Sequence, residues 1–239
     1  MIYVTADLHG YPFSAFQSLL EKAAFGEDDF LFILGDVIDR GEDGVEYLKW
    51  LLQQPNAQLL LGNHEAMLLS CDFLFQEVTE ESVDALTADK LRLLSTWQQN
   101  GADPTLRALR KLNREDPDTL ADILDYLRDA PLYEAVSAGA RDFLLVHSGL
   151  GGFAPEKRMR DYTPEELLWH RPDPEDRYFD DVITVLGHTP TGYYSPEYRG
   201  RMLQTDTWLD IDTGAGSGLA PMLLRLDDLQ PFYVTEDKN

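Results

Sequence analysis

The sequence predicts an α/β fold in which short buried strands alternate with helices and carry polar side chains at their ends. Five apolar runs each end in a cluster of glycine, aspartate or histidine, which is typical of buried strands that lead into loops. Amphipathic segments separate the first three runs, and a long helical stretch separates the third from the fourth. The five runs are residues 2–10, 30–41, 57–65, 143–149 and 182–189.

The first three runs predict the start of a parallel sheet, because a helix connects each strand to the next. Residues 14–24 place apolar side chains at helical spacing, and residues 45–54 form a second amphipathic segment that Pro55 ends. The runs lack polar alternation, which indicates strands that are covered on both faces.

Residues 66–130 have the pattern of helices throughout and predict a helical insert between the third and fourth strands. Asp103–Pro104 and Asp116–Pro117 are signals for helix starts, and Asn100–Gly101 interrupts the pattern. The pattern fits a lid over a site and a structural cap equally well.

The second half of the chain is richer in predicted strands. Residues 131–136 and 141–147 flank a turn of small residues and predict a hairpin, and residues 207–216, 221–228 and 231–237 are expected to form closing antiparallel strands. The chain contains no internal repeat and no low-complexity linker, so we expect residues 1–239 to form a single domain that carries the insert.

Composition restricts the class of partner. The chain has 20 Lys and Arg against 43 Asp and Glu, a net charge of −23, so duplex nucleic acid is not an expected partner. The single cysteine, Cys71, excludes an intramolecular disulfide and a thiolate zinc cluster, and its apolar surroundings predict burial. Without a signal peptide or a long apolar run, we expect a cytoplasmic protein that does not enter a membrane.

The polar strand ends supply the ligands that hard or borderline divalent metals take. Asp7 and His9 stand two residues apart, so both side chains face the same way on an extended segment. The sequence has five histidines, and four of them lie in these clusters, whereas His170 does not and is interpreted as a surface or supporting residue. Ligands of open α/β sheets bind at the carboxyl ends of strands, so we expect the clusters to converge on one site.

In order and spacing, these clusters resemble the five motifs of the phosphoprotein phosphatase family of dinuclear metallophosphoesterases. Residues 212–219 are similar to the closing segment of its bacterial, bacteriophage-lambda-like serine/threonine phosphatase branch. The resemblance implies a calcineurin-like, four-layer α/β-β/α sandwich, with two mixed sheets face to face and helices outside. The five motifs read Asp7-x-His9-Gly10, Gly35-Asp36-x-x-Asp39-Arg40-Gly41, Gly62-Asn63-His64-Glu65, His147-Ser148-Gly149 and Gly187-His188-Thr189.

The resemblance also implies two divalent metal ions, with Mn²⁺ expected and Fe²⁺ or Zn²⁺ as alternatives. Asp36 would bridge the two ions, and a hydroxide shared between them would attack phosphorus in line without a covalent phosphoenzyme. One ion would be held by Asp7, His9 and Asp36, and the other by Asp36, Asn63, His147 and His188.

Catalytic and substrate-binding roles follow from the same resemblance. His64 would act as the general acid, and Asp39 would hydrogen-bond it and hold it protonated and oriented. Arg40 would grip the phosphate oxygens. A second phosphate-binding arginine is expected two positions after a tryptophan, which points to Arg171, with Arg158 and Arg160 as competitors.

The expected activity is metal-dependent hydrolysis of a phosphomonoester in a phosphorylated protein or small molecule, in the manner of a serine/threonine protein phosphatase. Leu61 departs from this branch, because many members have arginine there, and the related diadenosine tetraphosphatases have leucine. Asp39 and Glu65 favour the phosphatase branch. Three alternatives stay open: a dinucleoside polyphosphate hydrolase, a nuclease or polynucleotide phosphatase, and a non-catalytic phosphate-binding protein. The sequence does not indicate an oligomeric state.

Overall fold

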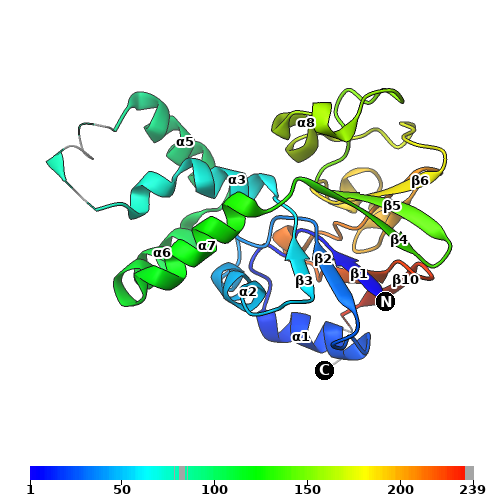
Figure 1. The fold of residues 1–239 in the computed structure, drawn as a ribbon, viewed down its shortest axis with the longest axis horizontal. Helices are drawn as coiled ribbons and strands as arrows, with labels where there is room; N and C mark the ends of the chain where they lie inside the picture. Colours follow the sequence, from blue (N-terminus) through cyan, green and yellow to red (C-terminus); the bar gives the residue numbers. More distant parts are fainter. Residues whose placement is uncertain (78, 81–83, 85, 235–239) are drawn as a thin grey trace.

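Two five-stranded sheets lie face to face in the computed structural model (Figure 1), which describes residues 1–77, 79–80, 84 and 86–234. The first sheet has the order β10-β9-β1-β2-β3. Its strands are β1 (Ile2–Thr5), β2 (Phe30–Ile33), β3 (Ala57–Leu59), β9 (Met222–Arg225) and β10 (Gln230–Tyr233). The second sheet has the order β4-β5-β6-β8-β7. Its strands are β4 (Tyr133–Ala138), β5 (Arg141–Val146), β6 (Val182–Leu186), β7 (Leu203–Gln204) and β8 (Trp208–Asp210).

The alternation of side chains along each strand builds the layers. In β1, Tyr3 packs into a core shared with the helices, whereas the next residue, Val4, lies in the core between the sheets. In β5, Phe143 joins the core between the sheets and Leu144 faces a third core on the opposite side. Each sheet is therefore buried on both faces, and the predicted four-layer sandwich is confirmed.

The first three strands run parallel, as predicted. Helix α1 (Phe13–Lys22) connects β1 to β2, and α2 (Gly44–Leu51) connects β2 to β3. Both helices lie below the first sheet in Figure 1, where they cover one of its faces. The short helix α8 (Pro164–Leu168) lies beside the second sheet and contributes Leu167 to the third core.

The closing strands depart from the prediction in one respect. β4 and β5 form the predicted hairpin, and β9 and β10 are antiparallel, with β9 also pairing with β1. However, β8 is parallel to β6 and antiparallel only to the short β7. Strand direction depends on which partner the packing selects, and a local apolar pattern carries no information on it. The end of the predicted strand 231–237 lies outside the described residues.

The predicted insert is helical in the part that the structure describes, which leaves out residues 78, 81–83 and 85. Its helices lie to one side of the sheets in Figure 1. Asp116 caps α7 as predicted, by accepting from the backbone N–H of Thr119, whereas Asp103 is the first residue of α6 rather than its cap. The helices are α3 (Asn63–Ser70), a 3-10 turn (Asp72–Phe75), α5 (Ala88–Gln99), α6 (Asp103–Glu115) and α7 (Pro117–Asp129).

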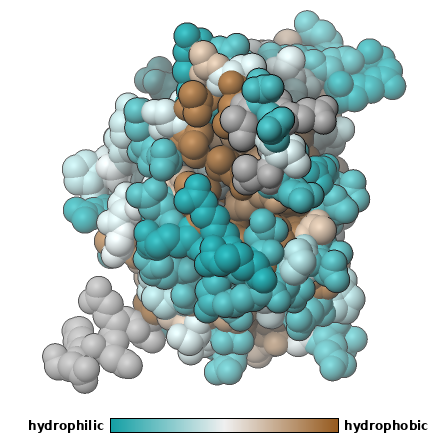
Figure 2. All heavy atoms as spheres, turned by 90° about the vertical axis from the view of Figure 1, so that its left-hand side faces the viewer, coloured by the Kyte–Doolittle hydropathy of each residue, from teal (hydrophilic) through white to brown (hydrophobic). Residues whose placement is uncertain are grey.

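One side of the insert packs into the core that the first sheet shares with its helices, and the other side is exposed. Trp97, Leu109 and Ile123 are fully buried, and Cys71 is buried among them as predicted. Figure 2 views this end of the molecule: hydrophilic side chains cover most of the face, and hydrophobic ones gather in a band in its upper half. Among the described residues, no helix is both long and apolar enough to cross a bilayer.

Candidate active site

Five strand ends position the predicted metal-ligating side chains. Asp7 and His9 follow β1, Asp36 follows β2, and Asn63 is the first residue of the helix after β3. His147 follows β5 directly, and His188 follows β6. Because β1, β2 and β3 are parallel, as are β5 and β6, their carboxyl ends meet at one edge of each sheet, and the facing sheets bring the two edges together.

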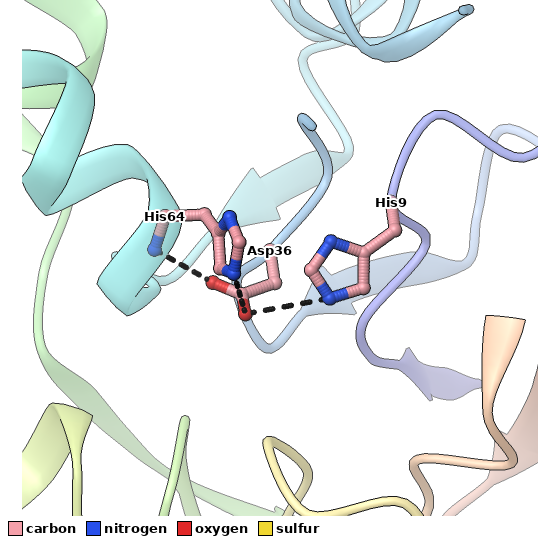
Figure 3. A group of neighbouring side chains, drawn as sticks. All are labelled: His9, Asp36 and His64. Atoms are coloured by element: carbon pink, nitrogen blue, oxygen red, sulfur yellow. Dashed lines mark hydrogen bonds and ion pairs between the residues drawn. The ribbon is translucent and has the colours of Figure 1, made fainter. Parts of the chain in front are cut away.

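The Asp36 carboxylate lies at the centre of this group. Its Oδ2 is 3.6 Å from Nε2 of His9, and its Oδ1 is 3.6 Å from Nε2 of His147. Its Oδ1 also accepts a hydrogen bond from the backbone N–H of His64 at 3.0 Å. Figure 3 shows His9 and His64 approaching Asp36 from opposite sides. One carboxylate therefore faces histidines from both sheets.

Asn63 and Asp7 complete the ring. Asn63 Oδ1 lies 2.9 Å from Nε2 of His147 and 2.9 Å from Nδ1 of His188. Asp7 Oδ2 accepts from the backbone N–H of His188 at 2.8 Å. All six predicted metal ligands are buried and linked to one another through these contacts.

The imidazoles are oriented as metal ligands are. Nδ1 of His9 lies 3.0 Å from the Ile38 carbonyl and Nδ1 of His147 lies 2.6 Å from the Leu34 carbonyl. A carbonyl only accepts, so each Nδ1 carries the proton and the Nε2 lone pair faces the site, which is the usual outer-contact pattern of metal-binding histidine. Nε2 of His147 therefore carries no proton and directs its lone pair toward Asn63 Oδ1, which also carries lone pairs. A cation bound between these two atoms would accept a lone pair from each. Nε2 of His188 is buried without a hydrogen-bond partner among the described residues.

Electrostatics agree with a cation in this position. Burial lowers the pKa of His9 to about 3 and also lowers the pKa of His147 and His188, so these rings are in the neutral form that binds metals. Burial raises the pKa of Asp7 well above its usual value, and the nearby Asp212 and Asp36 carboxylates raise it further. Buried carboxylates this close repel one another, and a divalent ion would remove that repulsion.

The donor atoms form two overlapping groups that could each hold an ion. One consists of His9, Asp36 and His64, and the other of Asp36, His147 and His188, with the ligand atoms of each group within 4.8 Å of one another. Asp36 belongs to both, as expected of a bridging carboxylate. The first group includes His64, which the sequence analysis assigns to proton transfer.

His64 has a second, shorter contact that fits proton transfer. Its Nδ1 donates to Asp39 Oδ2 at 2.6 Å, whereas its Nε2 is 3.8 Å from Asp36 Oδ2. Burial opposes protonation, but the Asp36 charge and the Asp39 hydrogen bond outweigh it and raise the pKa of His64. Nη2 of Arg40 lies 3.4 Å from Nε2 of His64, and Arg40 is exposed.

The three candidate arginines lie in different places. Arg171 Nη1 donates to Thr189 Oγ1 at 2.8 Å, in the loop that carries His188. Arg158 instead pairs with Asp161 at 2.8 Å, and Arg160 is 4.0 Å from the same carboxylate. Of the three, the structure brings Arg171 alone into contact with the loop of a predicted metal ligand.

Backbone strain is concentrated at the site. Among the described residues, eight non-glycine residues have positive φ, and six of them belong to the predicted site. The six are Asp7, His9, Asp36, Asp39, Arg40 and His188, with φ values from 45° to 70°. Each such residue costs of the order of 1–3 kcal/mol and persists where its surroundings hold it, as is common at functional sites. Gly35 and Gly62 allow two of these loops to touch, since a Cβ on Gly35 would lie 2.5 Å from Gly62 Cα.

Sequence reasoning missed two residues that support the site. Glu65, interpreted only as a marker of the family branch, accepts from the backbone N–H groups of Asp36 at 2.8 Å and Val37 at 2.9 Å and so anchors the Asp36 loop. Its position at the end of the Gly62-Asn63-His64-Glu65 motif was the signal in the sequence that could have indicated this supporting role. Trp97, in the insert, donates to Asp39 at 2.7 Å, and no local pattern could have indicated that contact.

A buried ring of carboxylate, imidazole and amide side chains at the strand ends of a two-sheet sandwich is the arrangement that a metal-dependent phosphoesterase requires. The chain belongs to the calcineurin-like phosphoesterase family, whose sequence profile matches residues 1–212.

Several relatives are named bis(5'-nucleosyl)-tetraphosphatase, symmetrical. One from Haemophilus ducreyi is 30% identical over 98% of this chain and 81% of its own length. One from Actinobacillus succinogenes is 32% identical over 62% of this chain, and one from Buchnera aphidicola is 39% identical over 28%. The matched segments span 44% and 25% of those two relatives. These names agree with the alternative of the sequence analysis rather than with the protein phosphatase branch.

Solved structures share the fold. One described as a candidate diadenosine tetraphosphatase has a TM-score of 0.64 at 18% identity and covers 100% of this chain and 94% of that chain. A Saccharomyces cerevisiae protein serine/threonine phosphatase with similarity to human phosphatase PP5 has a TM-score of 0.58 at 15% identity and covers 100% of this chain and 81% of that chain.

Proposed function

We propose that the protein hydrolyses the phosphoanhydride chain of a dinucleoside polyphosphate such as diadenosine tetraphosphate. The observation that carries the proposal is the 30% identity, over 98% of this chain, to a symmetrical bis(5'-nucleosyl)-tetraphosphatase. Leu61 supports it, because the tetraphosphatases resemble this chain in having leucine before the Gly-Asn-His motif. The finer branch predicted from the sequence is thereby replaced as the main hypothesis.

The residues present fit two divalent ions. When bound, these would activate water and neutralise charge on the reacting phosphate, and Mn²⁺ is the ion we expect. One would be held by Asp7, His9 and Asp36, and the other by Asp36, Asn63, His147 and His188.

The other side chains of the site would act on the substrate itself. Arg40 and Arg171 are both exposed, one on the first sheet's side and one on the second's, so their guanidinium groups can orient phosphate oxygens. His64 would give a proton to the leaving oxygen, and Asp39, which accepts from its Nδ1, would hold the ring in the productive tautomer.

A second candidate is hydrolysis of serine or threonine phosphomonoesters, and the Asp39–His64 contact of 2.6 Å favours it. An alkoxide is a poor leaving group and needs a proton in the transition state, whereas the nucleotide released from an anhydride is a weaker base that needs one less. A buried, aspartate-supported histidine is therefore of most use on a monoester.

One comparison separates the two candidates. The purified protein, supplied with Mn²⁺, would be assayed on diadenosine tetraphosphate, a phosphothreonine peptide and p-nitrophenyl phosphate. We expect the dinucleotide to be cleaved to ADP with a kcat/KM at least about tenfold above that of the peptide, equivalent to ~1.4 kcal/mol of transition-state stabilisation. Preference for the peptide would establish the second candidate. Inactivity on all three with metal bound would contradict both and favour the phosphate-binding alternative.

Arg171→Ala should weaken this activity without removing metal. A hydrogen bond to a charged group contributes about 1.5–3 kcal/mol, so we expect kcat/KM for the best substrate to fall by about 10–100-fold. Arg158→Ala is the matched control, since Arg158 pairs with Asp161 instead. If the control loses activity and Arg171→Ala does not, the phosphate-binding role belongs to Arg158.

A further inference from the structure

Trp97 reaches the candidate active site from the helical insert. It lies in α5, 58 positions after Asp39 in the sequence, and its indole is fully buried. Its Nε1–H donates to Asp39 Oδ2 at 2.7 Å. The same oxygen accepts from Nδ1 of His64 at 2.6 Å. The insert and the candidate general acid therefore share one carboxylate oxygen.

Asp39 depends strongly on these two donors. Its side chain is fully buried, and its other carboxylate oxygen, Oδ1, has no hydrogen-bond partner among the described residues. A buried carboxylate is destabilised when it loses a hydrogen-bond donor, because no water replaces the lost contact. Two donors on one oxygen also fix the rotation of the carboxylate, so that Oδ2 stays directed at the His64 ring.

The same part of the insert holds the backbone beneath this carboxylate. Thr105 Oγ1 accepts from the backbone N–H of Asp39 at 2.9 Å, and the Gly101 carbonyl accepts from the backbone N–H of Arg40 at 2.9 Å. Asp39 and Arg40 both have left-handed backbones, at φ of 70° and 68°, so these contacts stabilise a strained conformation. Gly101 lies so close that a Cβ there would be 2.8 Å from Cγ of Arg40.

We infer that the helical insert is part of the active site, and that Trp97 is a positioning residue that orients Asp39 and, through it, His64. Thr105 and Gly101 hold the backbone of Asp39 and Arg40 in the same way. Because these contacts are buried, we interpret the insert as a support for the active site and not as a lid over it. The inference rests on the proposed hydrolysis of a phosphate ester or anhydride, whichever of the two substrates is correct.

Trp97→Phe tests the inference, because it removes the N–H donor and keeps an aromatic ring. The test substrates are aryl phosphates of graded leaving-group pKa, assayed with Mn²⁺. Loss of an outer contact of this kind lowers activity by about 10–100-fold in metal sites. We expect such a fall in kcat for the poorest leaving group and a much smaller one for p-nitrophenyl phosphate, with KM and metal content unchanged. Trp50→Phe is the matched control, since Trp50 lies in α2 and packs against Phe13 and Phe16 of α1.

An equal loss for every leaving group, or the same loss in Trp50→Phe, would overturn the inference. If Trp97→Phe fails to fold, Thr105→Val and Thr105→Ser replace it. The valine variant, which lacks the hydroxyl, should show the leaving-group dependence, and the serine variant should not. If Thr105→Val shows no leaving-group dependence, or if Thr105→Ser shows it as well, the inference is contradicted.

A second measurement does not need turnover. The proton between His64 and Asp39 should give a proton NMR signal at low field that disappears in Asp39→Asn. We expect this signal to shift or broaden in Trp97→Phe and to stay unchanged in Trp50→Phe. An unchanged signal in Trp97→Phe would overturn the positioning role. Inactivity of the wild-type protein would count against the proposed function and leave this measurement to decide the inference alone.

Discussion

Asp36→Asn should abolish metal binding and turnover together. Asp36 is shared by the two groups of donor atoms and lies 3.6 Å from Nε2 of both His9 and His147. Replacing a residue that only supports a metal ligand lowers metal affinity or activity by about 10–100-fold. Loss of a shared carboxylate should therefore exceed ~100-fold in both quantities. The measurements are metal content after dialysis and kcat/KM on the best substrate with added Mn²⁺.

The change is conservative enough to interpret. Asparagine keeps an oxygen that can accept the backbone N–H of His64, which Asp36 Oδ1 accepts at 3.0 Å, so the loop should keep its conformation. Asp181→Asn is the matched control, because Asp181 is exposed and lies on the far, amino-terminal side of β6. Two ions retained in Asp36→Asn, with turnover near that of the control, would contradict the bridging role.

His64→Asn should separate proton transfer from metal binding. If His64 is the general acid, the variant keeps its metal and loses about 10²–10⁴-fold in kcat on substrates with poor leaving groups. The loss should be much smaller for p-nitrophenyl phosphate, whose leaving group needs no proton. The test is needed because the structure also allows His64 to be a metal ligand. Its side chain belongs to a group with His9 and Asp36 that could hold a cation.

Metal content decides between these roles. Loss of one ion from His64→Asn, with equal loss of activity on every substrate, would make His64 a ligand and contradict the general-acid role. His170→Asn is the control, since His170 is a half-buried histidine outside the group of predicted metal ligands. It should retain both metal and activity.

Much of the fold and the candidate site follows from local pattern. A buried strand that ends in glycine and a polar residue can be recognised in isolation, and parallel strands necessarily direct their carboxyl ends to one edge. This is why Asp7 and Asp36, which follow parallel strands of one sheet, could be predicted to lie together. Asp7 and His188 follow strands of different sheets and are linked by a hydrogen bond of 2.8 Å because the two sheets face each other. Their assignment as metal ligands stays a prediction.

Other features depended on contacts between segments that no local pattern connects. The direction of β8 and the hydrogen bond from Trp97 to Asp39 are both of this kind. The sequence alone determined which strand ends carry the polar side chains of the site, because period and burial are local properties of the chain. Only the tertiary structure decided what holds the Asp39 carboxylate in place, because a hydrogen bond across 58 residues exists only once packing has brought its two ends together.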